Sequence, residues 1–522
     1  MIEKAEPSLI GRRFCVEEKK GTILYQGPVG ATKGEWLGVE WDDPSRGKHD
    51  GAHEGVRYFI PRNYSPTSSS FLRINKVNLG INLLEGVRLR YGKVEGETAG
   101  VGQECMDDLQ KEIGARFVQV VGFDKVNKHQ SQLDKLKSVS VGNMNINDTH
   151  VEIFSTLTSM VDLDLSDNLL SSWSNISDLV SQVPLRVLNL SFNHLPVPNS
   201  IPVDKYSHLV HLILGSMGYS WSDVERIAGD LPKLENLQVH RNKIKDISLT
   251  PGKFTKLKGL DLDSNLIDDW TEIQNLSTLQ TLEYLQLNDN RMSNIKIESG
   301  MFKNLKGLQL GFNLISEWYH VSELNKLNIT ELRFRNNPVL QSEKLGEGRS
   351  TLVVLISSLK VLNGSEIQDT ERKWAEIDYY KKHGLEYLRV LQVSEEERTS
   401  ALETFTRTHG RYIELVNKFG EPTEGELKVK ESNLKSSLVL VKISSPNLVD
   451  TPPLEKKLPV NMTVAKLKAL VGRLFRKDAG GAELKLVLVS SRSPEQKEEM
   501  DNDLRELAYY SLENEDTLLV SW

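Results

Sequence analysis

The chain has 522 residues, enough for about three domains, and its 39% apolar and 26% charged residues are typical of a globular protein. A net charge of −7 argues against a general nucleic-acid-binding protein, and no apolar run approaches the ~20 residues that a membrane helix needs. The two cysteines, Cys15 and Cys105, cannot form a disulfide framework or a zinc site unaided, and the first residues lack a signal-peptide core, so we expect a cytosolic protein.

Residues 8–80 have the pattern of a small β-barrel. Glycines separate short strand-like runs such as Gly21–Tyr25 and Trp36–Trp41. The glycine density could indicate phosphate-binding loops, but the chain has no Gly-x-x-x-x-Gly-Lys-Ser/Thr pattern. The sequence therefore predicts a β domain without a nucleotide site.

The run Gly47-Lys48-His49-Asp50-Gly51 is the most specific motif of this segment. It resembles the signature loop of the CAP-Gly domain, which usually reads Gly-Lys-Asn-Asp-Gly, with His49 at the place of the commoner Asn. The resemblance implies binding of the acidic C-terminal tails of tubulin and related proteins, which end in an aromatic residue and a free carboxylate.

The local chemistry suits such a ligand. Between Pro44 and Lys76 the chain has six Arg or Lys against two acids, a basic island in an acidic chain. Lys48 can face carboxylates, and His49 can donate one hydrogen bond. The expected groove residues are Trp36, Gly47, Lys48, His49, Asp50, Gly51, Phe71 and Arg73. Trp41 and Phe59 are expected to fill the core instead of the groove.

Residues 81–130 are predicted to be a linker that ends in an N-terminal cap. Glycines interrupt the segment, and Gly114–Val121 has a strand-like pattern. A repeat array needs a polar cap at its end, and the segment from Phe123 to Leu133 is placed to supply one.

Residues 131–364 are predicted to be a leucine-rich-repeat solenoid. The register Leu282-Glu-Tyr-Leu285-Gln-Leu287-Asn-Asp-Asn290 recurs along this segment at intervals of 23 to 25 residues. The repeated Asn falls at 168, 193, 242, 265, 290, 313 and 337, and Met replaces it at 144 and 217. Leu285 and Leu287 are predicted to point inward from a short strand, and Asn290 to satisfy backbone groups at the bend.

The outward strand residues are predicted to line a concave, polar, protein-binding face. They include Asp162, Asp164, Asn189, His211, Gln238, His240, Asp261, Asp263, Gln286, Asn288, Gln309, Arg333 and Arg335. Acids come early in this row and arginines late, so Arg333 and Arg335 are candidate partner-binding residues. A merely solvated face is the alternative.

A second period of tryptophans predicts helices on the outer side of alternate repeats. Trp173, Trp221, Trp270 and Trp318 follow every other turn, at spacings of 48, 49 and 48. A helical pattern follows each Trp, and two pairs fit a capping box, Ser222 with Glu225 and Thr271 with Gln274. The rings are expected to pack in the core rather than to bind a ligand.

The residue pattern of the C-terminal third changes twice. Residues 365–430 read as a C-terminal cap and a charged helical linker. Residues 434–522 have the order ββαβ…β, with Thr463 before the helical run, and resemble ubiquitin. The chain ends in Val-Ser-Trp522 without Gly-Gly, which favours a binding module over conjugation to other proteins.

The whole is predicted to be a multi-domain protein of α/β and β parts, and the order of the three domains resembles the tubulin-folding cofactor E family of tubulin-specific chaperones. That resemblance implies capture of α-tubulin through its acidic tail and assembly with β-tubulin in company with the other tubulin cofactors. It also implies dissociation of the heterodimer and a cytoplasmic, cytoskeleton-associated protein.

Other classes stay open at this point. A microtubule-decorating CAP-Gly adaptor usually carries a dimerising coiled coil, and the sequence has no sustained heptads. A ubiquitin-pathway client adaptor would bind the proteasome through residues 434–522. An enzyme is not supported, because no Cys/His pair, metal cluster or phosphate loop stands out, and we expect no catalytic site, metal or cofactor.

Overall fold

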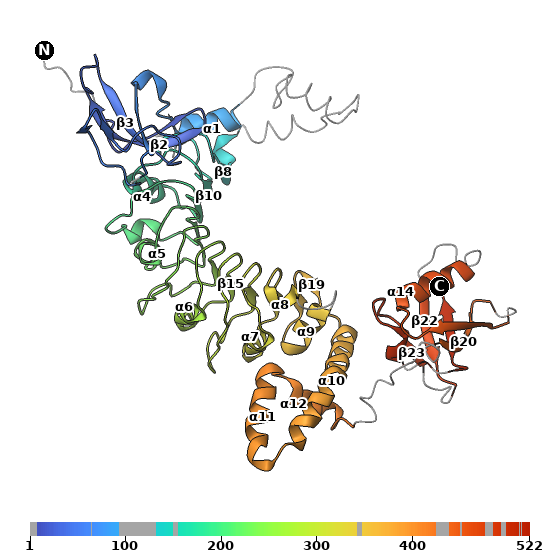
Figure 1. The fold of residues 1–522 in the computed structure, drawn as a ribbon. Helices are drawn as coiled ribbons and strands as arrows, with labels where there is room; N and C mark the ends of the chain where they lie inside the picture. Colours follow the sequence, from blue (N-terminus) through green and yellow to red (C-terminus); the bar gives the residue numbers. More distant parts are fainter. Residues whose placement is uncertain are drawn as a thin grey trace. The chain divides into compact units, whose positions relative to one another are not determined.

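The computed structural model describes residues 8–63, 65–92, 132–149, 155–341, 347–423, 438–448, 452–475, 484–491, 497–510, 512 and 514–522. The chain divides into two compact units. The first holds the N-terminal sheet and the repeat solenoid, and the second holds the C-terminal β-grasp domain (Figure 1). Within the described residues, no helix is both long and apolar enough to cross a bilayer.

The N-terminal domain is an open antiparallel sheet where a closed barrel was predicted. Its strands are β1 (Arg13–Val16), β2 (Lys19–Gly27), β3 (Trp36–Trp41) and β6 (Ser69–Leu72), hydrogen-bonded in the order β1-β2-β3-β6. The short strands β4 (Ala52–His53) and β5 (Val56–Arg57) form a separate hairpin. Phe14, Ile23, Val39 and Trp41 fill the core, which confirms the structural role expected for Trp41.

The beginning of the predicted linker is ordered and covers the first repeat. Strand β7 (Ile81–Asn82) pairs with β9 (Ile146–Asp148), and helix α1 (Leu83–Tyr91) follows. The Asn82 side chain accepts a hydrogen bond from the Glu85 amide and so caps α1, whose Leu83 is buried. The strand-like run Gly114–Val121 and most of the predicted cap from Phe123 lie outside the described residues.

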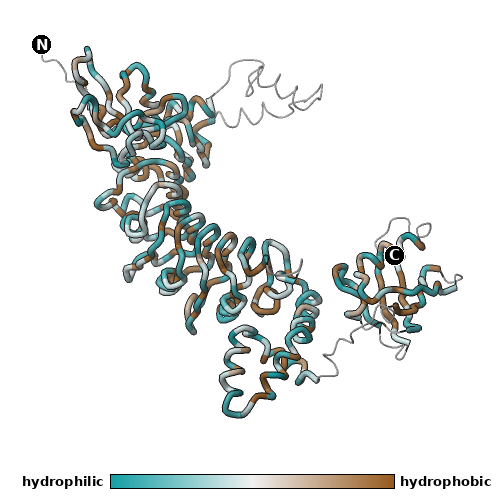
Figure 2. Tube along the Cα trace, viewed as in Figure 1, coloured by the Kyte–Doolittle hydropathy of each residue, from teal (hydrophilic) through white to brown (hydrophobic). Residues whose placement is uncertain are grey.

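The repeats form an eleven-stranded sheet in which all neighbours except the last pair are parallel. Its strands are β8 (Ser138–Ser140), β10 (Asp162–Asp164), β11 (Val187–Asn189), β12 (His211–Ile213), β13 (Asn236–Gln238), β14 (Gly259–Asp261), β15 (Tyr284–Gln286), β16 (Gly307–Gln309), β17 (Glu331–Arg333), β18 (Val361–Leu362) and β19 (Ser365–Glu366). Each turn of the solenoid carries both hydrophobic and hydrophilic stretches (Figure 2). The predicted inward residues Leu285 and Leu287 are buried.

The repeated Asn residues satisfy backbone groups at the bends, as predicted, and they also form a ladder that joins neighbouring repeats. The amide nitrogen of Asn265 donates to the carbonyls of Leu262 in its own repeat and Val239 in the preceding one. Its oxygen accepts from the backbone amides of Asn242 and Ile244. One buried side chain thus satisfies backbone groups on two repeats.

Helices alternate on the outer side as predicted: α4 (Trp173–Gln182), α5 (Trp221–Ala228), α6 (Trp270–Gln274) and α7 (Trp318–Ser322). The predicted capping boxes were wrong in register. The box of α5 joins Ser220 to Asp223, and α6 is capped by Asp269. Each Trp is itself the first helical residue, so the cap must precede it. Single 3-10 turns lie at Val203–Tyr206, Asn275–Thr278 and Glu323–Lys326.

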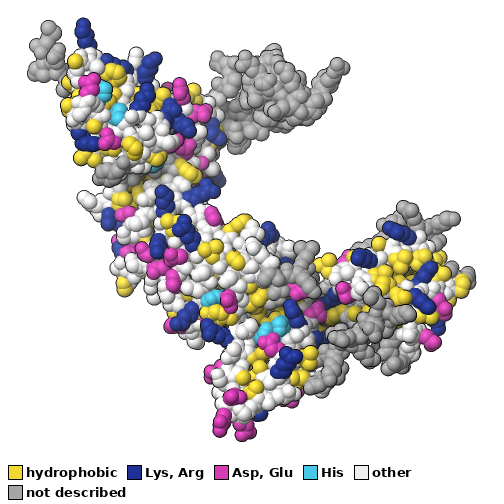
Figure 3. Space-filling view, in the orientation of Figure 1, with side chains coloured by type: hydrophobic (Ala, Val, Ile, Leu, Met, Phe, Trp, Pro, Cys, Tyr) yellow, Lys and Arg dark blue, Asp and Glu magenta, His cyan; other side chains and the backbone are white. Residues whose placement is uncertain are grey.

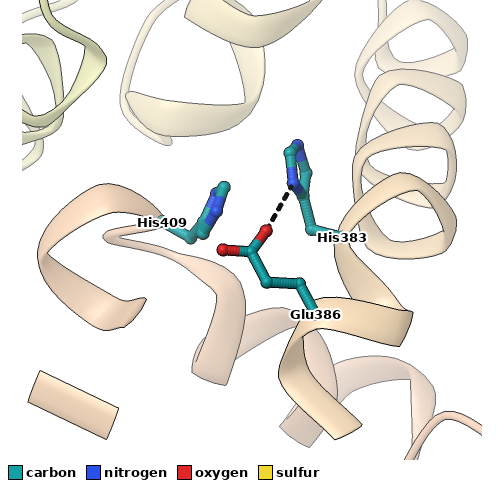
Figure 4. A group of neighbouring side chains, drawn as sticks. All are labelled: His383, Glu386 and His409. Atoms are coloured by element: carbon teal, nitrogen blue, oxygen red, sulfur yellow. Dashed lines mark ion pairs between the residues drawn. The ribbon is translucent and has the colours of Figure 1, made fainter. Parts of the chain in front are cut away.

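A helical segment closes the C-terminal end of the solenoid. It comprises α8 (Pro338–Gln341), α9 (Glu347–Leu355), α10 (Asp369–Gln392), α11 (Glu395–Thr408) and α12 (Tyr412–Phe419). The Arg372 guanidinium donates to the Val353 carbonyl, and a buried ion pair joins Arg411 to Glu376. On α10, one turn apart, His383 and Glu386 form the ion pair drawn in Figure 4.

The C-terminal domain is a β-grasp with its own core. Its elements are β20 (Leu438–Ser444), β21 (Leu454–Pro459), α14 (Val464–Leu474), β22 (Lys485–Val489), β23 (Lys497–Glu499), the 3-10 turn Leu507–Tyr510 and β24 (Thr517–Ser521). The sheet order is β21-β20-β24-β22-β23, with β20 and β24 parallel. The Thr463 side chain caps α14, as the sequence predicted.

Candidate functional site

The signature loop of the N-terminal domain is tied to strand β6 in a way that only glycine permits. The Lys48 amide donates to the Ser69 carbonyl at 2.7 Å, and the Ser69 amide donates to the His49 carbonyl at 2.9 Å. A Cβ added at Gly47 would lie 2.4 Å from the Ser69 backbone, and one at Gly51 would lie 2.3 Å from the Phe59 carbonyl. Gly51 also has φ +92°, which side chains rarely adopt.

His49 presents a hydrogen-bond donor inside an aromatic cluster. Its ring stacks on Phe71 with centroids 4.7 Å apart, and its Nδ1 accepts from the Gly51 amide at 3.0 Å. Burial and the neighbouring His53 hold the pKa of His49 below its ordinary value. The neutral ring therefore carries its hydrogen on Nε2, which is buried and has no hydrogen-bond partner among the described residues.

Phe71 is the centre of this cluster, and sequence reasoning identified only part of it. Phe71 also packs edge-on against the rings of Tyr25, His53, Tyr58 and Phe59, at centroid distances of 5.3 to 6.4 Å. Phe59 is buried against Gly38, as expected for a core residue. Tyr58 follows the short strand β5 directly, and the clustering of aromatic residues around the loop was the available signal for it.

Of the two charged loop residues, only Lys48 is free to meet a ligand. Lys48 is exposed. The Asp50 carboxylate instead accepts from the Arg57 guanidinium at 2.7 Å, and the Asp50 carbonyl accepts from the same guanidinium at 2.8 Å. That hydrogen bond with Arg57 lowers the pKa of Asp50. Asp50 therefore fixes the shape of the loop.

Arg73 and Trp36, two of the expected groove residues, contact each other. The Arg73 guanidinium lies over the Trp36 ring, 3.8 Å from its centroid, and donates to the carbonyls of Glu35 and Lys33. The indole of Trp36 donates to the Thr32 hydroxyl at 2.7 Å. The arginine thus holds the loop before β3 against the ring, so its contribution to a ligand site is to position Trp36.

The concave face carries a second candidate site, separate from the loop. A hollow of about 320 Å³ lies over strands β13 to β18 and is lined by polar side chains that include Gln238, Asp261, Gln286, Gln309 and Arg333. Arg335 does not line it, because its guanidinium donates to the Asn363 carbonyl at 2.8 Å. The structure therefore places Arg333 and Arg335 at neighbouring positions with different surroundings.

A buried lysine joins the N-terminal sheet to the first repeats. The Lys20 ammonium, whose side chain is 9% exposed, contacts the carboxylate of Asp167 at 2.6 Å and the side-chain oxygen of Asn143 at 3.3 Å. Beside it, Asp42 of the sheet lies 3.7 Å from His194 of the solenoid. The signature loop and the concave face consequently belong to one compact unit.

Comparisons with known proteins agree with this arrangement. The family model of the CAP-Gly domain matches residues 10–77. Tubulin-specific chaperone E of Bos taurus is 37% identical, and that of Homo sapiens 36% identical, each aligned over 100% of both chains. Among solved structures, the C-terminal ubiquitin-like domain of mouse tubulin-specific chaperone E is 41% identical, with a TM-score of 0.16, and the match covers 18% of this chain and 93% of that one.

Proposed function

Since this chain belongs to the tubulin-specific chaperone E family, we propose that it captures α-tubulin, assembles it with β-tubulin together with the other tubulin cofactors, and can dissociate the heterodimer. The observation that carries this proposal is the loop of the CAP-Gly domain, which offers an exposed Lys48 and an unpaired His49 donor beside an aromatic cluster. Those groups suit a peptide that ends in an aromatic residue and a carboxylate.

The proposed place of action is the cytoplasm, in association with the cytoskeleton. The proposal assigns the chemistry to binding alone, with no catalytic residue. Any energy for remodelling then comes from binding or from nucleotide held by tubulin. A proteasome contact through the ubiquitin-like domain is the alternative use of that domain.

The primary test mixes the purified protein with soluble tubulin, either intact or with its tails removed by protease, and sizes the complexes. The proposal expects a complex with intact tubulin that is weakened by tail removal. A protein that instead co-sediments with polymerised microtubules and leaves soluble dimers untouched would be a microtubule adaptor, and the chaperone proposal would be wrong.

Replacing both Lys48 and His49 by Ala should weaken binding of an acidic tail peptide at least about tenfold. Each charge-assisted hydrogen bond contributes about 1.5–3 kcal/mol, and 1.4 kcal/mol corresponds to about tenfold in affinity. Fluorescence anisotropy of a labelled peptide measures the effect, which should shrink as salt is raised. Lys19→Ala, an exposed lysine at the β1–β2 turn, is the matched control. Unchanged affinity in a folded double variant would remove the loop from the site.

Reversing the charge of Arg333 and Arg335 to Glu should reduce capture of whole α-tubulin by about tenfold or more and leave tail-peptide binding intact. A tail alone offers too little area to select a folded subunit, so the concave face should supply further contacts. The control reverses Lys233 and Lys256, exposed residues outside the strands. If peptide and whole-subunit binding fall together, or neither falls, the proposed division between loop and concave face is wrong.

A further inference from the structure

One edge of the solenoid is formed by the residue that precedes the repeated Asn, or Met217 where Met replaces it. At this position the backbone is left-handed in every repeat from β10 to β17, with φ between 51° and 61°. The residues there are Asp167, Phe192, Ser216, Arg241, Ser264, Asp289, Phe312 and Asn336. Short polar side chains tolerate this conformation best, because they can hydrogen-bond locally, whereas bulky ones are disfavoured.

The two phenylalanines break that pattern and gain little from the fold in return. Phe192 is 43% exposed and Phe312 is 56% exposed. Leu314, two residues after Phe312, is 53% exposed. The two phenylalanines are bulky side chains on a left-handed backbone, and all three side chains face solvent. Neither packing nor backbone conformation explains these residues, whereas contact with a bound partner would explain them.

The same edge already holds a protein surface at its N-terminal end. Asp167 is the equivalent of Phe192 one repeat earlier, and its carboxylate forms an ion pair with Lys20 of the CAP-Gly domain. His194, two residues after Phe192, faces Asp42 of that domain. The edge that carries Phe192 and Phe312 therefore continues directly from an internal protein–protein contact.

Between the two rings the edge is basic. At the positions directly before and after the ladder residues, the exposed charges are Arg241, Lys243 and Arg291 against one acid, Asp289. Phe192 and Phe312 lie five repeats apart, about 24 Å at 4.8 Å per strand. That span exceeds a small molecule or a single side chain and matches a protein interface of about 800 Å² per partner. Exposed aromatic and arginine side chains are the residue types that anchor such interfaces.

We propose that this edge, defined by Phe192, Arg241, Lys243, Arg291, Phe312 and Leu314, docks the folded body of an acidic protein, and that this protein is the tubulin subunit whose tail the CAP-Gly groove holds. The inference rests on the proposed function and adds a surface distinct from both the groove and the concave hollow. Continuity with the CAP-Gly contact places one client within reach of both sites.

The test replaces Phe192 and Phe312 by Asn in the full-length protein. Asn suits the left-handed backbone, so the variant should unfold at the same temperature as the wild type or about 1–3 °C higher. Its affinity for tail-trimmed tubulin heterodimer should nevertheless fall at least about tenfold, while binding of a tail peptide stays unchanged. Asn336→Ser, at the same backbone position one repeat beyond Phe312, is the matched control and should alter neither reading.

The outcomes separate the two proposals. If the wild type binds trimmed tubulin and the double variant binds it within twofold, the edge is not a docking surface. A lower unfolding temperature would show that the rings serve the fold, and a change from dimer to monomer on sizing would assign the edge to self-association. Either result overturns the inference and leaves the proposed function intact. If the wild type binds no tubulin in any form, the proposed function itself fails.

Discussion

Asn265→Ala should lower the free energy of unfolding of the solenoid by roughly 3–5 kcal/mol, because the change leaves two buried backbone amides without an acceptor at about 1–3 kcal/mol each. The backbone amides of Asn242 and Ile244 lose their acceptor. The carbonyls of Val239 and Leu262 also lose one donor, but each keeps another, the side chain of Asn242 or of Asn290. Alanine has no side-chain oxygen that could accept from these two amides, and water cannot reach them, since Asn265 is 3% exposed.

Urea unfolding followed by circular dichroism measures this loss. Asn236→Ala is the matched control, since Asn236 is an exposed asparagine on the neighbouring strand β13 and should change stability by less than about 0.5 kcal/mol. Equal stability of the Asn265 and Asn236 variants would mean that the ladder contributes little to the stacking of repeats.

Removing every residue after Pro422 should abolish heterodimer assembly and dissociation and leave tail-peptide binding unchanged. The truncation keeps α12, whose Tyr412 and Leu415 are buried, and deletes the whole β-grasp domain. A client tethered by the CAP-Gly groove meets the remaining domains of the same chain at an effective concentration of about millimolar. We expect the ubiquitin-like domain to act on the captured client, or on a second cofactor, under that condition.

The deleted domain added back as a separate polypeptide provides the control, since it has its own hydrophobic core. Rescue only at concentrations near the effective concentration of about 1 mM would support joint action within one chain. Full activity of the truncated protein without any addition would leave the domain as a dispensable docking tag.

The sequence by itself determined the features that repeat or are local. The Asn at intervals of 23 to 25 residues predicted which side chains satisfy the backbone at each bend, and the structure adds that each also bonds groups about one repeat away. The Trp period predicted the outer helices, and the run from Gly47 to Gly51 predicted the signature loop. Such patterns can be recognised in a sequence because every repeat packs its apolar residues against the next repeat in the same way.

Only the tertiary structure decided which charges meet. Lys20 and Asp167 are 147 residues apart, and neither has a neighbouring motif that indicates an ion pair. The sequence predicted Arg73 and Asp50 to be ligand contacts. In the structure the Arg73 guanidinium lies over the Trp36 ring, and the Asp50 carboxylate accepts from Arg57. The exposure of Phe312 likewise follows from the solenoid edge on which its repeat places it. A charge or a ring has no periodicity of its own, so its partner depends on how distant segments pack.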